Sequence, residues 1–344
     1  MSSMGKLLIA FLFNVRHRYH DPHDPRFELE VDFDDPKTIK AIEDNLQQAG
    51  YQVLPIEANR QAYAILKKNR RRIDLVFNYA EGIYGHDREA QLPAILEMLQ
   101  ISYTGSGPLT QCLCLNKAKA KEVLLINQVP VLPSQLFETS KDKLPRKLQF
   151  PLLVKPLSQG SSAGITQQSI VNNYDQLRAQ VKKIIRTFKQ PALVEPFLKG
   201  REFSIGMWGN PPKLLPIIEP DFTKLPKNYL PLDSLEVKWI YEEEGKENHL
   251  QCPAKVSRQL SQLLEKICLK TWEALEIQDW CRVDLRCDEA NRPYVLEVNS
   301  PAGLIPPELS QASYFPLAAR AAGIKYQELL KKIVNTALRR YGKI

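Results

Sequence analysis

The stretch RVDLRCDEANRPYVLEVNSPAG, residues 282–303, decides the fold of this chain. Two apolar, alternating runs, Cys281–Cys287 and Pro293–Val298, flank the polar residues 288–292. Alternating runs on either side of a short polar cluster are typical of two antiparallel strands joined by a turn. The sequence therefore predicts a β-hairpin at this point.

Four polar side chains are expected on one face of this hairpin. Side chains alternate along a strand, so Arg282 and Asp284 share a face. With a turn centred on residues 290–291, Asp284 lies across from Glu297 and Arg282 lies across from Asn299. Opposed carboxylates repel unless a cation separates them, and an all-oxygen set suits Mg²⁺. The alternative is a hairpin with one charged face that is exposed to solvent. The hairpin alone does not distinguish this from a metal site, so the rest of the chain is needed.

Composition limits the class of protein. A chain of 344 residues is long enough for two or three structural units. Its apolar and charged fractions, 44% and 25%, are those of an ordinary globular protein. The net charge of +8 favours anionic ligands, phosphates or nucleic acid. The cations are scattered, and the dense run at 69–72 is expected at a solvated helix end, so a nucleic-acid partner is not expected.

No export or membrane signal is expected. The apolar run Leu7–Val15 follows Lys6 but has no small-residue cleavage site, and basic residues come next. It is interpreted as a buried first strand of a cytoplasmic protein, and no apolar run reaches membrane-spanning length. The cysteines show no metal-binding spacing and are expected to be free thiols; they are Cys112, Cys114, Cys252, Cys268, Cys281 and Cys287.

The first third of the chain alternates strands and helices. Alternation of this kind predicts a small parallel sheet with helices on its faces. The histidine-rich stretch 17–25 contains two prolines and irregular spacing, which favours a mobile loop over a metal site. The expected strands are 6–13, 51–56, 73–77 and 101–103, and the expected helices are 36–49, 61–68 and 88–99.

The middle of the chain carries a candidate phosphate site. The apolar strand 150–156 ends at Lys155, and a loop of small and polar residues, 157–165, follows it. A lysine at the exit of a buried strand beside such a loop suits a phosphate tail. Asn116 is expected to cap a helix at 117–126, whose alternate lysines are usually solvent-facing. Further helices are predicted at 257–275 and 326–340.

Several short motifs, in their order along the chain, resemble those of the D-alanine–D-alanine ligase family of ATP-grasp enzymes. The resemblance covers nearly the whole chain from Phe77 onward. The pieces that carry it are Tyr103–Gly107, Asn116-Lys117, Val154–Pro156 with Gly160-Ser161-Ser162, Glu195 with Gly200-x-Glu202, Cys252–Ala254, Arg282-x-Asp284, Glu297-x-Asn299 and Phe315–Arg320.

The resemblance implies an α/β fold, the ATP-grasp fold preceded by a Rossmann-like domain. The expected domains are a Rossmann-like domain at 1–113, a small lobe at 114–196 and a large lobe at 197–344, with ATP held between the lobes. The implied cofactors are ATP and two Mg²⁺ ions, with Mn²⁺ as a substitute metal. The implied partners are amino-acid substrates, and a homodimer is considered.

The resemblance also implies roles for individual residues. The ATP-binding residues are expected to be Lys117, Lys155, Ser161, Ser162, Glu195, Glu202 and Lys238; the catalytic residues Arg282, Ser161 and Lys238; the metal ligands Asp284, Glu297 and Asn299; and the substrate-binding residues Glu81, Ser313 and Tyr314. Of these, Arg282 is expected at the oxyanion of the tetrahedral intermediate, Glu195 at the adenine and Glu202 at the ribose.

The departures from the family pattern concern the amino-acid substrates. The segment 14–26 is long and lacks the family's glycine, and Glu28 or Glu30 is the candidate for its first-substrate glutamate. Glu81 stands where the family generally has histidine, and the segment 303–316 is several residues longer than usual. These changes put the substrate in question rather than the chemistry.

Three functions remain open from the sequence. The first is a ligase that joins D-alanine to D-alanine for peptidoglycan through an acyl phosphate. The second keeps the chemistry but uses another amino acid or a small peptide in secondary metabolism. The third is a nucleotide-binding regulator without turnover, against which the complete metal set argues.

Overall fold

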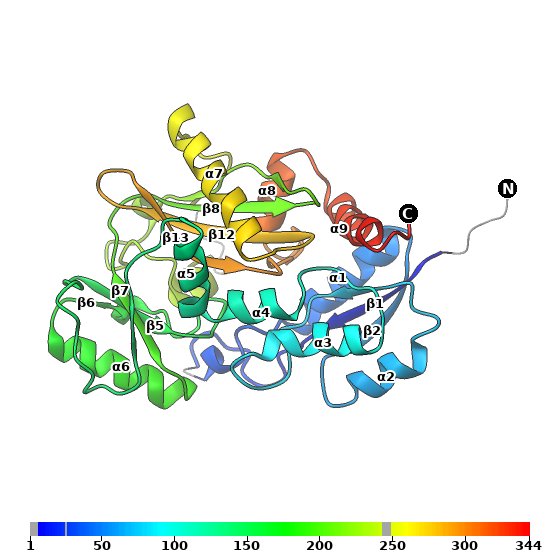
Figure 1. Cartoon of the computed structure of the whole chain (residues 1–344), viewed down its shortest axis with the longest axis horizontal. Coiled ribbons are helices and arrows are strands. Elements are labelled where there is room, and N and C mark those ends of the chain that lie inside the picture. The colour runs from blue at the N-terminus through cyan, green and yellow to red at the C-terminus, as the bar shows by residue number, and fades with distance from the viewer. Residues whose placement is uncertain (1–5, 25, 243–248) are drawn as a thin grey trace.

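A computed structural model describes residues 6–24, 26–242 and 249–344. Figure 1 shows an N-terminal part and a C-terminal part, with a smaller sheet at the far end from both termini. Three sheets of three or four strands form the frame, and a two-stranded ribbon of β10 (Glu219–Pro220) and β11 (Leu250–Gln251) adds to it. The division into domains at 113/114 and 196/197 stays a prediction.

The N-terminal sheet has the strand order β2-β1-β3, and both pairings are parallel. Alternate side chains of its strands pack on helices on both faces, α1 and α9 on one and α2 and α3 on the other. The carboxyl ends of parallel strands share one edge of a sheet, which is the usual place for a ligand. The elements are β1 (Leu8–Phe13), β2 (Gln52–Glu57), β3 (Leu75–Asn78), α1 (Pro36–Gln48), α2 (Ala62–Asn69), α3 (Gln91–Met98) and α9 (Tyr326–Arg340).

The small sheet has the order β4-β7-β5-β6 and carries one helix, α6. Val154 and Val194 pair across the strands and pack on α6, so Lys155 and Glu195, the next residues along, face the other way. The elements are β4 (Gln135–Phe137), β5 (Leu152–Pro156), β6 (Ile170–Val171), β7 (Ala192–Pro196) and α6 (Tyr174–Phe188).

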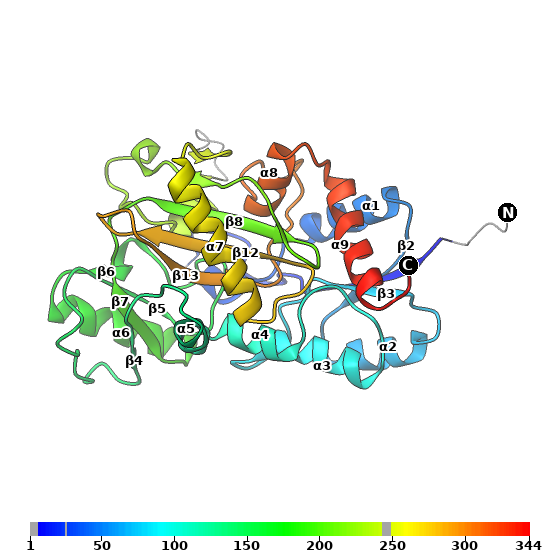
Figure 2. The ribbon, with the colours of Figure 1, turned by 45° about the horizontal axis from the view of Figure 1, so that its top comes forward.

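The large sheet has the order β13-β12-β8-β9 and contains the predicted hairpin. The register pairs Asp284 with Glu297 and Arg282 with Asn299, so the sequence prediction is confirmed. Helix α7 covers one face, as Figure 2 shows, and the buried residues of β8 and β12 pack against it. The elements are β8 (Glu202–Trp208), β9 (Lys213–Leu214), β12 (Trp280–Cys287), β13 (Pro293–Asn299), α7 (Arg258–Ala274) and α8 (Tyr314–Ala321).

Most predicted elements are present with small changes at their ends. The expected strand at 101–103 is wrong: Tyr103 forms a single parallel bridge with Val76. Helix α5 (Lys117–Ile126) has the predicted bounds, and Asn116 caps it by accepting a hydrogen bond from the amide of Lys119. All six cysteines are free, as predicted. The loop expected at 17–25 includes Pro25, which lies outside the described residues.

A buried carboxylate, Asp279, joins the N-terminal part to the C-terminal part. It accepts hydrogen bonds from the amide of Gly105 at 2.7 Å and from Nη2 of Arg340, in α9, at 2.8 Å. Arg340 also donates to the carbonyls of Tyr103 and Gly105. Asp279 is fully buried, and the side chain of Arg340 is 21% exposed, so the pair is mostly but not wholly sheltered from solvent. This junction fixes the N-terminal sheet relative to the large sheet.

Replacing Asp279 by alanine should lower the free energy of unfolding by about 3–5 kcal/mol, because it leaves the charge of Arg340 without its buried partner. Denaturant unfolding followed by circular dichroism measures the loss. Asp44→Ala is the control, since Asp44 is exposed and pairs with Lys40 within α1. A loss for Asp279→Ala no larger than that of the control would contradict the junction.

Candidate functional site

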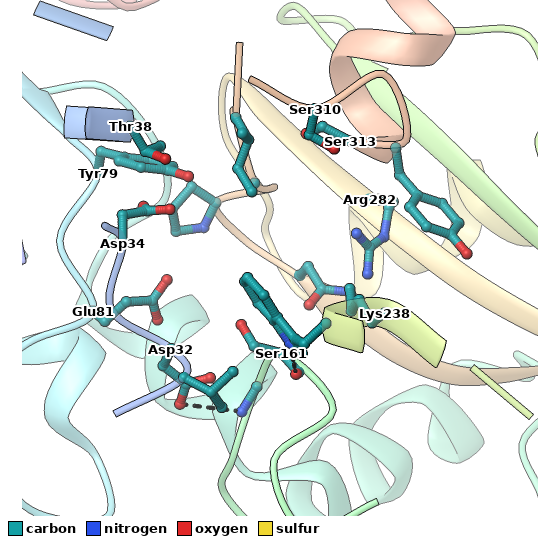
Figure 3. A pocket seen from close by; sticks show the side chains of 18 of the residues that line it. Asp32, Asp34, Thr38, Tyr79, Glu81, Ser161, Lys238, Arg282, Ser310 and Ser313 are labelled. Carbon is teal, nitrogen blue, oxygen red and sulfur yellow. Dashed lines mark hydrogen bonds between the residues drawn. The ribbon is translucent and has the colours of Figure 1, made fainter. Parts of the chain in front are cut away.

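A cavity of about 850 Å³ lies between the N-terminal sheet and the hairpin. Figure 3 shows its two walls: Tyr79, Asp34 and Glu81 on one side, and Arg282, Lys238, Ser310 and Ser313 on the other. Ser161 comes from the loop after β5. The edge of the N-terminal sheet where β1 and β3 end therefore faces the polar side of the hairpin, and a smaller cavity of about 60 Å³ continues toward the small sheet.

The hairpin residues converge as the register requires. Arg282 donates to both carboxylate oxygens of Asp284, at 2.8 and 2.9 Å, and Asn299 donates to Asp284 at 2.9 Å. The hydroxyl of Ser204, on β8, bonds the same carboxylate. The guanidinium of Arg282 lies 5.0 Å from the ring centre of Tyr314. Asp284 is thus held on three sides, and Arg282 reaches both cavities.

Glu297 lies among four cationic side chains on the polar face of the hairpin. Burial by itself would raise its pKa, but Lys117, Lys155, Arg282 and Lys238 outweigh burial and lower the pKa to about 2. The ammonium of Lys117 lies 3.5 Å from Glu297. The face of the hairpin therefore carries a fixed negative charge among four cations.

Lys117 and Lys121 correct the expectation that the lysines of α5 face solvent. Both are buried, while Lys119 is exposed and pairs with Glu122. Lys117 donates to the carbonyl of Gln159 at 2.5 Å, which ties α5 to the loop after β5.

Lys155 and Lys121 both pair with Glu195, which is fully buried. Burial raises the pKa of Glu195, but the two lysines outweigh it and lower the pKa to about 2. Glu195 thus balances only one of the two buried ammonium groups. Lys155 lines the smaller cavity, where its ammonium can meet an anion.

Glu202 lies in the same smaller cavity and pairs with Arg286 at 2.9 Å. Burial raises its pKa to about 7; Arg286 opposes this, and the nearby carboxylates of Asp233, Asp284 and Glu297 add to it. Arg286 alone therefore does not balance the negative charge of Glu202 and its neighbouring carboxylates.

The donor set fits a divalent cation. Among the described residues no group of three or more His, Cys, Asp or Glu is arranged as a metal site. The hairpin supplies two carboxylates and one amide oxygen, Asp284, Glu297 and Asn299, and hard cations such as Mg²⁺ are often held by one or two carboxylates together with phosphate oxygens. A cation at this position would relieve the repulsion that raises the pKa of Glu202.

The loop after β5 is held in an unusual backbone conformation. Ser161 and Ser162 have φ values of 50° and 61°, the left-handed region that non-glycine residues seldom adopt. The indole of Trp239 donates to the carbonyl of Ser161 at 3.0 Å, and the hydroxyl of Ser162 donates to the carbonyl of Asp233 at 2.9 Å. Such backbone conformations often occur at ligand sites.

Ser313 and Tyr314 both line the large cavity at the start of α8. Tyr314 is buried, and its hydroxyl lies 3.4 Å from Asp233. Lys238 lies between them and the loop, 3.9 Å from Asp233. The structure thus brings the predicted substrate and catalytic residues into one cavity.

The opposite wall carries acidic residues that sequence reasoning missed. Asp32 and Glu89 line the cavity with Glu81. Arg88 donates to Asp32 at 2.6 Å and to the carbonyl of Ser158 at 3.0 Å. Burial raises the pKa of Glu81 well above its usual value, and repulsion from Glu89 and Asp32 adds to it. Burial also raises the pKa of Glu89, to about 7.

Asp34 is a third missed residue of this wall. Burial raises its pKa to about 7, against a hydrogen bond from Tyr79 that lowers it. Tyr79 in turn accepts the amide of Leu304 at 3.0 Å. The candidates Glu28 and Glu30 do not line the cavity, so the sequence placed the acidic group on the wrong part of this segment. Asp32 and Asp34 lie in irregular backbone, where no periodicity marks them.

The comparisons with known proteins agree on one family. Residues 123–335 match the family described as "D-ala D-ala ligase C-terminus". The chain is 34% identical over 303 residues to the uncharacterized protein y4sG of Sinorhizobium fredii, with 86% of each chain covered. It is 32% identical over 313 residues to a D-alanine–D-alanine ligase of Carboxydothermus hydrogenoformans, covering 88% of this chain and 93% of the relative.

A solved structure agrees in fold. The D-alanine–D-alanine ligase of Bacillus anthracis superimposes with a TM-score of 0.72 at 26% identity, covering 98% of this chain and 99% of that chain. A second structure of the same protein, complexed with ATP, gives 0.70 at 24% identity. No helix among the described residues has the length and apolar character needed to cross a membrane.

The raised pKa values predict the direction of pH dependence. Asp34 and Glu89 have pKa values of about 7 when folded and about 4 when unfolded. As pH rises from about 4 to about 7, the unfolded chain releases these protons first, so stability falls. Without nucleotide or metal, the melting temperature should be higher at about pH 5 than at about pH 8.

Glu89→Gln should make this decline shallower, because glutamine does not titrate. Differential scanning calorimetry across the pH range measures it, with Glu122→Gln, an exposed glutamate of α5, as the control. An identical decline in wild type and Glu89→Gln would contradict the raised pKa.

Proposed function

The chain belongs to the D-alanine–D-alanine ligase family, and we propose that it joins a carboxylate to an amine at the expense of ATP, through an acyl phosphate, in the manner of a D-alanine–D-alanine ligase. The product would be a dipeptide for peptidoglycan. The observation that carries the proposal is the convergence of the hairpin face with Lys117 and Lys155 at the junction of the two cavities.

The chemistry explains why so many charges are needed. Oxide is a poor leaving group, so a carboxylate does not react with an amine until a phosphoryl group is transferred to it. Bringing a carboxylate to a triphosphate requires several negative charges to be neutralised. Lys117, Lys155 and Lys238 lie near Glu297 and supply part of this neutralisation.

The nucleotide is proposed to bind on the side of the smaller cavity. Lys117 and Lys155 bind its phosphates, Glu195 lies at the adenine and Glu202 at the ribose. The smaller cavity measures about 60 Å³, below the roughly 300 Å³ typical of a small-molecule site, so binding requires the small sheet to move away from the large one. The loop with Ser161 and Ser162 closes over the phosphates and keeps water from the acyl phosphate.

Asp284, Glu297 and Asn299 are proposed to hold two Mg²⁺ ions, which Mn²⁺ can replace. Bound there, the metal neutralises phosphate charge and orients the triphosphate. Side chains of the protein stabilise the reacting groups. Arg282 stabilises the oxyanion of the tetrahedral intermediate, and Ser161 and Lys238 assist it.

The amino acids are proposed to bind in the large cavity. Ser313 and Tyr314 meet the carboxylate of the amino acid that provides the amine, and Glu81 meets the ammonium of the amino acid that is activated. Asn14 holds the backbone of Glu81, since its side-chain oxygen accepts the Glu81 amide at 2.8 Å. The cytoplasmic location and a homodimer remain predictions.

A second candidate function keeps this chemistry with a different amino acid or a small peptide. It is favoured by the acidic wall of Asp32, Asp34, Glu81 and Glu89, which is more than one α-ammonium group needs. A regulator without turnover is not supported by any feature of the site.

D-Alanine at millimolar concentration should stimulate ADP release from ATP and Mg²⁺ by the purified protein, because both of its charged groups have partners in the cavity. A coupled ADP assay with D- and L-amino acids measures this. Strong stimulation by another amino acid or a peptide, with none by D-alanine, would support the second candidate instead.

Glu297→Gln should lower ATP turnover by orders of magnitude, since it removes one anionic ligand and keeps the shape. Its thermal unfolding is measured alongside, because Glu297 also balances four cations. Glu265→Gln, an exposed change on α7, is the control. Wild-type turnover by a folded Glu297→Gln protein would contradict the metal assignment.

A further inference from the structure

The two walls of the large cavity differ in charge. On the hairpin side, where phosphate and carboxylate groups are proposed to bind, Lys238 and Arg282 are offset by Glu242 and Glu297. On the N-terminal side four carboxyl groups face two guanidinium groups, while Asp35 and Lys37 offset each other near the rim. The four carboxyl groups are those of Asp32, Asp34, Glu81 and Glu89, and the two guanidinium groups are those of Arg16 and Arg88.

Asp32 shows that this wall is incompletely satisfied within the protein. Its side chain is only 9% exposed, and Oδ2 pairs with Arg88. Oδ1 is buried and has no hydrogen-bond partner among the described residues. A buried carboxylate oxygen without a donor costs free energy, unless a ligand supplies the donor. Gly160 allows this placement, because a Cβ there would lie 2.9 Å from Oδ1.

Glu81 and Glu89 form the second acceptor on this wall. They share a hydrogen bond, which two carboxyl groups make when one of them is protonated. The groups that face the pair are Asp32 and Arg88 and, from α5, Lys117. In Figure 3 the carboxyl group of Glu81 points into the cavity, above Asp32. A cation that binds here replaces the shared proton as the counter-charge.

The cavity also exceeds what two alanines occupy. Two alanines hold twelve non-hydrogen atoms, which at roughly 30 Å³ each, the volume of a water molecule, fill at most about 360 Å³. The cavity measures about 850 Å³. More than half of it is therefore open to a larger side chain and to the transferred phosphoryl group.

We propose that the amino acid whose carboxylate is activated carries a second cationic group on its side chain, an amine or a guanidine, and that this group binds between Asp32 and the Glu81–Glu89 pair. The proposal rests on the ligase function above and names its substrate class. Glu89 and Asp32 then determine which side chain the enzyme accepts. The wall has two negative charges more than its two guanidinium groups balance; the α-ammonium group of the substrate neutralises one of them and the cationic side chain neutralises the other. An acidic side chain is repelled by the same wall.

The test compares side chains of equal length that differ in charge. ADP release is measured with ATP, Mg²⁺ and both enantiomers of lysine, ornithine and arginine, against norleucine, glutamine and glutamate. A cationic side chain should raise kcat/KM by at least about tenfold over its neutral counterpart, which corresponds to about 1.4 kcal/mol. Glu89→Gln and Asp32→Asn should reduce this ratio, and the exposed Glu122→Gln should leave it unchanged.

Binding is measured separately so that failure of the ligase function is distinguishable. Calorimetry with Mg²⁺ and a non-hydrolysable ATP analogue should show lysine binding more tightly than norleucine, with proton release that Glu89→Gln diminishes. This preference without ADP release for any amino acid would reject the ligase function and keep the cationic site. ADP release with D-alanine, together with no preference for cationic side chains in either assay, would overturn this inference and keep the ligase. If no amino acid stimulates ADP release and no cationic amino acid is preferred in binding, both the ligase function and the cationic site are overturned.

Discussion

The pairing of β12 with β13 is the constraint on which the site depends. One register places Arg282, Asp284, Glu297 and Asn299 together, and a slip of one residue would turn a strand's polar side chains toward α7. That slip is prevented by the opposite face, where Cys281, Val283 and Leu285 are fully buried against α7. The hydrophobic core therefore sets the geometry of the polar site, although Cys281, Val283 and Leu285 do not line the large cavity. The same alternation acts in the small sheet, where Val154 and Val194 pack on α6 and leave Lys155 and Glu195 facing the large sheet.

Two clusters of buried charge are imperfectly balanced among the described residues. Near the smaller cavity two lysines share Glu195, while the carboxylates around Glu202 raise its pKa. Near Asp32 and the Glu81–Glu89 pair the excess is negative. Poorly balanced buried charge is costly, so both clusters lower the stability of the free protein. A nucleotide with its metal at the first cluster and a cationic group at the second would offset this cost, which connects the stability of the chain to its proposed substrates.

The parts of the structure that follow from the sequence are those with a strong local pattern. The hairpin and its register follow from period-two alternation, and α5 follows from its Asn116 cap. Ser161, Arg282 and Ser313, which the resemblance assigned to the site, line one cavity. Three things could not be predicted. Tyr103 pairs through one bridge because the chain turns at Gly105, so no strand forms. Lys117 and Lys121 face inward because the partners that accept them, Gln159 and Glu195, are distant in sequence. Asp32 and Asp34 lie in irregular backbone, and only tertiary contacts bring them to the cavity.

The junction at Asp279 also determines how the molecule can change shape. Asp279 binds Gly105 on one side and Arg340 on the other, and α9 packs on both the N-terminal sheet and the α8 side of the large sheet. These contacts hold the two parts together. The small sheet has a separate core around Phe137, Leu152 and α6, and the polar contacts of Lys155 and Glu195 lie between it and the large sheet. The loop after β5, which carries Gly160 and Ser161, also lines the amino-acid cavity, and Arg88 donates to the carbonyl of Ser158 in that loop. A motion of the small sheet that admits a nucleotide therefore also moves one wall of this cavity. Substrate selection and nucleotide exchange are mechanically coupled in this architecture.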